Sequence, residues 1–138
     1  MLSTVARLLY DPMGKVPQER TRGWAVLVTW TFYPLAALLT FFGGLRAIAG
    51  MVTLILAVDA LKRGTAKMRP DQSDRRSFPS GHSAGAWFLA AVGHWNPLVV
   101  MWSAAVSASR VVMRRHDAVD VTVGAAIGML IGMLIRGR

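Results

Sequence analysis

The chain has 138 residues, enough for one domain; 54% of them are hydrophobic and 17% are charged. Because soluble domains carry about 25% charged residues, this composition indicates a membrane protein. A formal net charge of +9 would suggest nucleic-acid binding in a soluble protein, but here the basic residues lie between apolar runs. Lipid headgroups, phosphates or membrane orientation explain them better, and nucleic acid is not expected as a partner. The chain contains no cysteine, which excludes disulfides and thiolate metal sites.

Residues 1–23 are expected to form an N-terminal interfacial segment ahead of the first membrane span. Leu2, Val5 and Leu9 share one helical face in this segment, so it can lie on the membrane surface. A frayed terminus explains the same pattern equally well.

The apolar runs predict about five membrane helices, at residues 24–42, 45–61, 82–95, 97–113 and 118–135. The first run reaches roughly the thickness of the bilayer hydrocarbon, at about 1.5 Å per residue. The third run is short for a span, so bilayer thinning, tilt or oligomerisation would have to compensate. The expected fold is an all-α, multi-pass transmembrane bundle that forms a single domain over residues 1–138.

Small residues repeat at helical spacing in the last two runs. Gly124, Gly128 and Gly132 recur every four residues, and Ser103 and Ser107 do the same in the preceding run. Small residues at this spacing let helix backbones approach closely within a membrane. The glycine face can serve internal packing or an oligomer equally well, and chance in a Gly/Ala-rich helix also explains it.

Three polar stretches fall on one side of the membrane if five helices alternate across it. They are the N-terminal segment, the loop at residues 62–80 and the loop at residues 110–117. All but three of the 16 Lys and Arg residues belong to this side. The tendency of positive charge to stay inside therefore favours a cytoplasmic location for this face.

The candidate site residues come from two of these stretches and the helix starts beside them: Lys62, Arg69, Ser80, Gly81, His82, Arg110, His116 and Asp120. Three cations, a hydroxyl and backbone N–H groups at a helix start can bind a phosphate group. Two histidines in such a site suggest a nucleophile and a general acid. If His116 shares a helix with Asp120, the carboxylate can hold one ring nitrogen as N–H and free the other lone pair.

Each of these features also has a plain structural explanation. Basic residues beside membrane spans usually reach toward the headgroups, and Ser80 can be simply a helix N-cap. His116 with Asp120 can be a structural pair or metal ligands, although metal sites need more His or carboxylate ligands than this cluster offers. His94 lies near the opposite face beside Trp95, so we interpret it as interfacial and non-catalytic.

Three motifs give the cluster a recognisable order. The segment from Lys62 reads "KRGTAKMRP", the segment from Pro79 reads "PSGH", and the segment from Ser109 reads "SRVVMRRHDAVD". In this order and without gaps, they resemble the type 2 phosphatidic acid phosphatase (PAP2) superfamily. The resemblance spans residues 62–120; the first two helices add no motif, and the usual membrane relatives have more spans.

The resemblance implies a PAP2/haloperoxidase-like core and a role for each motif residue. His116 would be the nucleophile that forms a phosphohistidine, Asp120 would orient it, and His82 would be the acid for the leaving group. The phosphate-binding residues would be Lys62, Arg69, Ser80, the Gly81 backbone and Arg110. The family needs no metal ion or other cofactor. The residues alone do not identify which histidine attacks; the resemblance supplies that assignment.

The implied function is a metal-independent membrane phosphatase whose partner is a lipid substrate in the bilayer. Family substrates include phosphatidic acid, phosphatidylglycerol phosphate, lipid A and polyprenyl (undecaprenyl) phosphates or diphosphates. A simple lipid phosphate or a polyprenyl (di)phosphate is expected for so short a chain. The inner cell membrane is the expected location, and many bacterial relatives place the active site outside, against the charge bias described above.

Three other functions fit the same residues less well. A phosphohistidine can pass its phosphoryl group to an alcohol, which would make the protein a lipid phosphotransferase. Vanadium haloperoxidases reuse the same anion site but are larger and soluble. A small non-catalytic membrane scaffold would keep its role after His116→Ala, whereas an enzyme would lose turnover.

Overall fold

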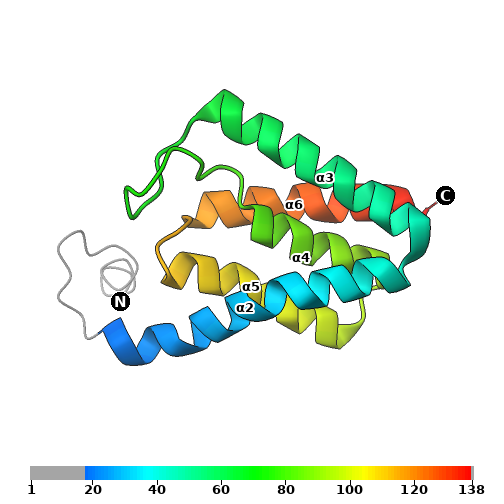
Figure 1. The fold of residues 1–138 in the computed structure, drawn as a ribbon, viewed down its shortest axis with the longest axis horizontal. Helices are drawn as coiled ribbons and strands as arrows, with labels where there is room; N and C mark the ends of the chain where they lie inside the picture. The colour runs from blue at the N-terminus through cyan, green and yellow to red at the C-terminus, as the bar shows by residue number, and fades with distance from the viewer. Residues whose placement is uncertain (1–17, 138) are drawn as a thin grey trace, which may run out of the picture.

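The computed structural model describes residues 18–137, which form five helices (Figure 1). They are α2 (Gln18–Phe42), α3 (Gly44–Thr65), α4 (Gly81–Val92), α5 (Pro97–Val112) and α6 (Ala118–Arg136). No strand occurs within this range, so the predicted all-α fold is confirmed. The interfacial segment predicted for residues 1–23 lies mostly outside the described residues, and from Gln18 onward the chain already belongs to α2.

Besides the start of α2, two helix boundaries differ from the predicted ones by more than one residue. Helix α3 continues to Thr65, so Lys62 lies on its last turn and the loop comprises residues 66–80. Lys62 and Arg63 are favourable there because a helix C-terminus carries partial negative charge. Helix α4 ends at Val92, because the backbone turns at Gly93 and both following residues, His94 and Trp95, have positive φ.

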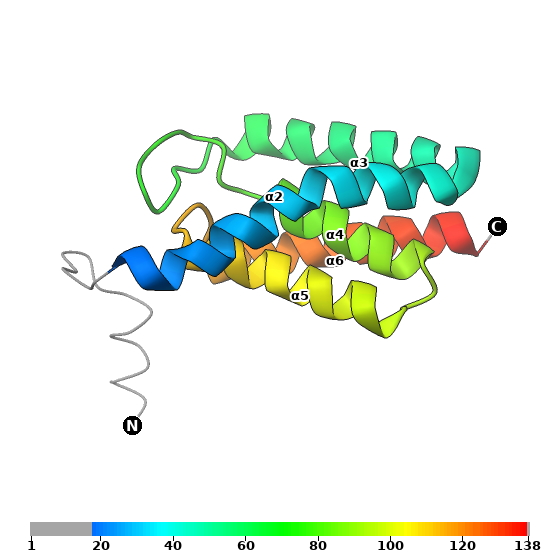
Figure 2. The same ribbon diagram turned by 60° about the horizontal axis from the view of Figure 1, so that its bottom comes forward.

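Among the five described helices, three are long and apolar enough to cross a membrane: Gly23–Phe42 of α2, α3 and α6. Helix α5 is apolar but shorter, and α4 has 12 residues. Helix α4 contacts all four other described helices and lies in the middle of the bundle (Figures 1 and 2). Its short length is therefore explained by a position in the protein core, where Phe88 and Leu89 are buried.

The glycine repeat of α6 packs against α4. A Cβ added to Gly124 would lie 2.4 Å from the Ser80 carbonyl oxygen, and one added to Gly128 would lie 2.0 Å from the Ala84 carbonyl oxygen. A Cβ on Gly132 would meet the Cβ of Ala91 at 2.7 Å. The face thus serves internal packing, one of the two predicted uses, and an oligomer through it stays a prediction.

Serine hydroxyls join α4 to α5 on the other side. Ser103 donates its hydroxyl to the Ala86 carbonyl at 2.8 Å, and the hydroxyls of Ser107 and Ser83 lie 2.9 Å apart. The indole N–H of Trp87 also donates to Ser107. These contacts, together with the glycine packing, fix α4 between α5 and α6, and with it the position of its N-terminus.

Candidate active site

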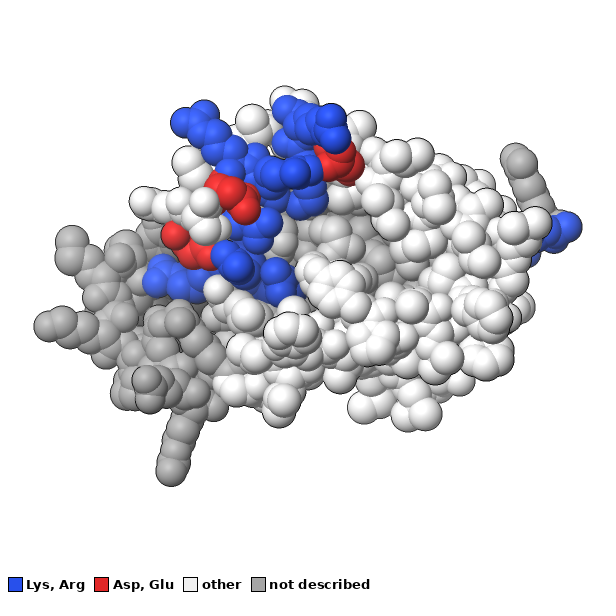
Figure 3. All heavy atoms as spheres, viewed as in Figure 1, with Lys and Arg blue, Asp and Glu red and all other residues white. Residues whose placement is uncertain are grey.

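Three segments meet at one end of the bundle: the loop at residues 66–80, the turn between α5 and α6, and the start of α4 (Figure 1). Lys and Arg side chains gather over this end, while the rest of the visible surface has few charges (Figure 3). Arg46 near the start of α3 and Arg136 at the end of α6 belong to the opposite end. The predicted convergence of polar stretches therefore holds for the segments that the structure describes.

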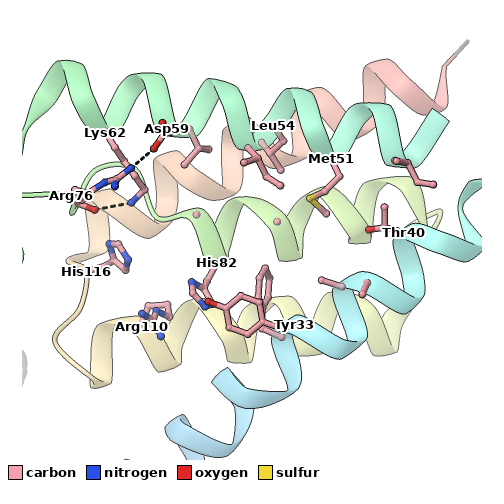
Figure 4. A pocket seen from close by; sticks show the side chains of 18 of the residues that line it. Tyr33, Thr40, Met51, Leu54, Asp59, Lys62, Arg76, His82, Arg110 and His116 are labelled. Carbon is pink, nitrogen blue, oxygen red and sulfur yellow. Dashed lines mark hydrogen bonds and ion pairs between the residues drawn. The ribbon is translucent and has the colours of Figure 1, made fainter. Parts of the chain in front are cut away.

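A cavity of about 870 Å³ opens between α2, α3 and α4 at this end. Six of the eight predicted site residues line it: Lys62, Arg69, Gly81, His82, Arg110 and His116. Figure 4 shows His82, Arg110 and His116 around the same space, with Lys62 across from them. Away from them the lining becomes apolar, with Ala36, Met51, Leu54 and Ile55 among its residues.

The N-terminus of α4 holds two of these groups in place. Ser80 is the N-cap of α4, since its hydroxyl accepts a hydrogen bond from the Ser83 N–H. Ser80 is fully buried and does not line the cavity, so the structure supports the capping interpretation over direct contact with phosphate. Gly81 and His82 follow in the first turn, where backbone N–H groups lack helical partners and favour anions.

The His82 ring packs between aromatic side chains of α2. Its centroid lies 4.6 Å from that of Phe32 and 5.4 Å from that of Tyr33. The Nε2 atom of His82 is buried and has no hydrogen-bond partner among the described residues. The ring is therefore fixed by packing, while one nitrogen remains available to a group inside the cavity.

His116 and Asp120 are close, although they do not share a helix. Helix α6 begins at Ala118 with Asp117 as its N-cap, so His116 lies in the preceding turn. This differs from the arrangement on one helix considered above, because Asp117 and Asp120 form a capping box that starts the helix after His116. His116 Nδ1 lies 3.6 Å from Asp120 Oδ2, beyond hydrogen-bond distance. The carboxylate faces the ring but is not yet bonded to it.

Two residues that the motifs did not indicate also contact Asp120. Lys67 Nζ lies 2.7 Å from Asp120 Oδ1, and the Ser77 hydroxyl donates to Oδ2. Lys67 falls between the two cations of the first motif, but its spacing gave no sign that it turns toward α6 instead of the cavity. Ser77 precedes the second motif and carried no signal in the sequence.

Burial lowers the pKa of His116 to about 4, and the positive charges of Lys62, Arg110 and Arg69 act in the same direction. The imidazole is therefore neutral near pH 7. A neutral imidazole has one nitrogen with a free lone pair, as a nucleophile requires.

The three predicted phosphate-binding cations have different surroundings. Arg110 is 6% exposed and donates to the Thr29 hydroxyl at 3.3 Å, but forms no ion pair with a described residue. Lys62 Nζ donates to the Arg76 carbonyl at 2.7 Å, and Arg69 pairs with Asp74 at 2.7 Å. A buried guanidinium without a carboxylate is costly, so an anion in the cavity would complete the surroundings of Arg110.

Three buried nitrogen atoms at this end lack partners in the described part of the chain: His82 Nε2, Arg110 Nε and His116 Nδ1. Buried polar atoms in folded proteins are nearly always hydrogen-bonded, so such a cluster calls for an explanation. A bound oxyanion can accept hydrogen bonds from groups of this kind. Over residues 18–137, no three His, Cys, Asp or Glu side chains are grouped so as to hold a metal ion.

The family model described as "PAP2 superfamily" matches residues 43–137, which include all eight predicted site residues. The chain belongs to the PAP2 superfamily. This PAP2 protein is 36% identical over 94 residues to a lipid A 1-phosphatase of Porphyromonas gingivalis. That match covers 62% of this chain and 21% of the relative, so the chain spans about a fifth of its length.

A solved structure with a similar fold is also found. The crystal structure of Aquifex aeolicus LpxE aligns with a TM-score of 0.64, covering 99% of this chain and 94% of that one. The sequence identity is 21%, so this similarity concerns the fold. The PAP2-like membrane bundle predicted from the motifs is confirmed.

Proposed function

We propose that this PAP2 protein is a membrane phosphatase that hydrolyses a lipid phosphate monoester or a polyprenyl (di)phosphate through a phosphohistidine at His116. One observation carries the proposal: a single cavity joins a cationic end lined by two histidines to an apolar limb between α2 and α3 (Figure 4). A phosphate fits the first part and a hydrocarbon tail fits the second. A soluble phosphate ester would not need the apolar limb.

The dimensions of the limb suit a lipid tail. Ile48 and Lys62 both line the cavity and lie 14 residues apart on α3, which corresponds to about 21 Å of helix. One leaflet of a bilayer is roughly 15 Å of hydrocarbon, half of the whole thickness. A phosphate held at Lys62 would therefore place its tail along α3, at the depth that tails occupy in the membrane.

The chemistry proceeds in two steps. In the first, His82 is the imidazolium, its charge offset by the bound phosphate. The His116 Nε2 lone pair attacks phosphorus, the bond from phosphorus to the lipid oxygen breaks, and that oxygen takes a proton from His82, which becomes neutral. In the second, His82 removes a proton from water, the resulting oxygen attacks phosphorus, and the P–N bond breaks. Inorganic phosphate leaves and both histidines return to their starting states.

The cations and Asp120 support these steps by charge. Lys62, Arg69 and Arg110 would stabilise the negative charge on the phosphoryl oxygens in the transition state, with the backbone N–H of Gly81. Asp120 would accept the Nδ1 proton of His116 in a hydrogen bond and stabilise the ring while it carries the phosphoryl group. The distance of 3.6 Å between His116 Nδ1 and Asp120 Oδ2 would shorten as the charge on the ring develops.

The test is phosphate release by the purified protein in detergent, with EDTA present. The panel contains phosphatidic acid, phosphatidylglycerol phosphate, lipid A and polyprenyl mono- and diphosphates, and the variants are His116→Asn and His94→Asn. His94 lies at the opposite end of α4 with positive φ, which Asn tolerates well, so it is a matched control. We expect release by wild type and His94→Asn and a loss of about 10³-fold or more in His116→Asn.

Two results would contradict the proposal. One is the absence of release from every lipid by protein that is demonstrably folded. The other is equal activity in His116→Asn and wild type. Phosphate appearing on an added alcohol instead of in solution would identify a phosphotransferase that uses the same intermediate.

We further propose an inner-membrane location with the site at one membrane face. The described cations at the site end outnumber Arg46 and Arg136 at the other, and this bias favours the cytoplasm for the site. A compartment-specific reporter fused after Arg138 tests the orientation, since α6 ends at the face opposite to the site. A cytoplasmic signal there would assign the site to the outer side.

A further inference from the structure

Lys67 lies between two residues of the first motif but is directed away from the cavity. Its ammonium group lies 2.5 Å from Asp117 Oδ2 and 2.7 Å from Asp120 Oδ1. Lys67 does not line the cavity, and its side chain is 37% exposed. It therefore joins the loop at residues 66–80 to the first turn of α6 and is not placed to bind a substrate in the cavity.

The contacts of Asp120 divide between its two oxygens. Oδ1 receives Lys67, while Oδ2 accepts from the Ser77 hydroxyl and from the Asp117 N–H at 3.1 Å. Oδ2 is also the oxygen that faces His116 Nδ1. The ion pair at Oδ1 thus fixes the rotation of the carboxylate and leaves Oδ2 turned to the ring.

The same loop is closed on itself around these contacts. The Ser77 N–H donates to the Lys67 carbonyl at 3.0 Å. The two residues whose side chains bind Asp120 are therefore also hydrogen-bonded to each other through their backbones. Within this closure, the Arg69 N–H donates to the Asp74 carbonyl at 2.9 Å. The contact at Asp120 therefore also fastens the loop that carries Arg69.

Asp120 is a fully buried charge, and such a charge is strongly destabilising unless it is compensated. The Lys67 hydrogen bonds to Asp117 and Asp120 raise the pKa of the ammonium, against the lowering by partial burial, so it stays charged. Without that charge, the carboxylate would stabilise the protonated form of the neighbouring imidazole more strongly.

We propose that Lys67 is a positioning residue for the nucleophile: it fixes the Asp120 carboxylate with Oδ2 toward His116 and offsets the carboxylate charge beside the ring. This inference rests on the proposed function of His116. The groups that face His116 include Asp120 from α6 and four others, namely Lys62 from α3, Arg69 from the loop, His82 from α4 and Arg110 from α5. Of these groups, Lys67 contacts Asp120, and it acts on His116 through that carboxylate.

The test compares Lys67→Met, which removes the charge at similar length, with Lys67→Arg, which keeps it. Arg63→Met is the control, since Arg63 forms an ion pair with Asp59 near the same loop but is 77% exposed and does not contact Asp120. Two readouts are measured in detergent: the titration midpoint of His116 by NMR of labelled imidazole, and the pH dependence of kcat/KM on the best lipid substrate.

We expect Lys67→Met to raise the His116 midpoint by roughly one unit, the lower end of the effect of a close charge. The low-pH limb of the kcat/KM profile should move to higher pH by the same amount, and kcat should fall about tenfold. Lys67→Arg should stay near wild type in both readouts, as should Arg63→Met. If Lys67→Met does not fold, Lys67→Gln replaces it, because Gln keeps hydrogen-bonding groups without the charge, and the same upward shift is expected.

An unchanged His116 midpoint in a folded, uncharged variant would overturn the proposal. So would a loss of activity in Lys67→Arg equal to that in Lys67→Met. The NMR readout needs no turnover, so it remains decisive for Lys67 if the wild type releases no phosphate. In that case the proposed function fails separately.

Discussion

Because α4 and α6 are in tight contact, we predict that Gly128→Ala lowers both stability and activity, although alanine normally favours a helix. A Cβ at this position would lie 2.0 Å from the Ala84 carbonyl oxygen, 2.8 Å from its carbon and 3.0 Å from the Phe88 nitrogen. All three atoms belong to the α4 backbone, so no side-chain rotation can relieve the overlap. Ordinary contacts of a Cβ begin at 3.4 Å, 1.4 Å more than the 2.0 Å found here, so the two helices would have to separate by an ångström or more.

The magnitude follows from this separation. Overpacking of this kind costs about 1–3 kcal/mol of stability. The displacement would also reach the site, because the Ser80 N–H donates to the Asp120 carbonyl at 2.9 Å and His82 lies two residues further on. A shift of about 1 Å in a catalytic group can lower the rate by roughly 10²-fold.

Gly64→Ala is the matched control for this substitution. Gly64 lies in the last turn of α3, and an added Cβ there meets nothing within 4 Å. Helix propensity alone predicts a gain of up to about 1 kcal/mol for either change. Thermal unfolding in detergent and phosphate release should therefore show Gly64→Ala at or above wild type and Gly128→Ala well below it. Equal stability of the two variants would refute the packing argument.

Three further predictions concern the cavity and the charge on His116. Met51→Trp should shorten the apolar limb and lower kcat/KM for long-tailed lipids about tenfold more than for short-tailed ones, whereas Leu45→Trp on an exposed part of α3 should not. Stability should fall as the pH drops from about 6.5 to about 4, because unfolded His116 takes up a proton in that window and the folded form does not. In His116→Asn, the unfolding temperature should depend less on pH in this window. A variant whose unfolding temperature falls with pH as steeply as that of wild type would argue against a buried neutral ring. Arg110→Lys should lower kcat/KM by 10-fold or more at unchanged stability, since an ammonium cannot form the forked contact of a guanidinium; activity close to wild type would exclude such a contact.

Much of the fold followed from hydropathy and spacing. The apolar runs predicted the five helices of the described residues, and the spacing of Gly124, Gly128 and Gly132 indicated close helix contact. The pattern did not identify the partner helix, because a stripe of small residues fits any neighbouring backbone. It also did not show that the short helix α4 lies at the centre, since a short apolar run is compatible with a tilted span.

The candidate site was predicted less completely. Motif order brought His82, Arg110 and His116 to one cavity, as the structure has them. The cap at Ser80 and the ion pairs of Lys67 depend on how the loop folds over α6, which spacing along the chain does not encode. A residue type shows which chemistry is possible, whereas the direction of its side chain is set by tertiary contacts.

The most direct test of His116 as the nucleophile is a rapid-quench experiment with a phosphate-labelled lipid. The protein is mixed with excess substrate, stopped in alkali within the first turnover, and digested for mass spectrometry. We expect a phosphoryl group on His116 that is stable in alkali, lost in acid and absent from His116→Asn. Full turnover without a phosphoprotein, or a label on His82 instead, would contradict the assignment of His116 as the nucleophile.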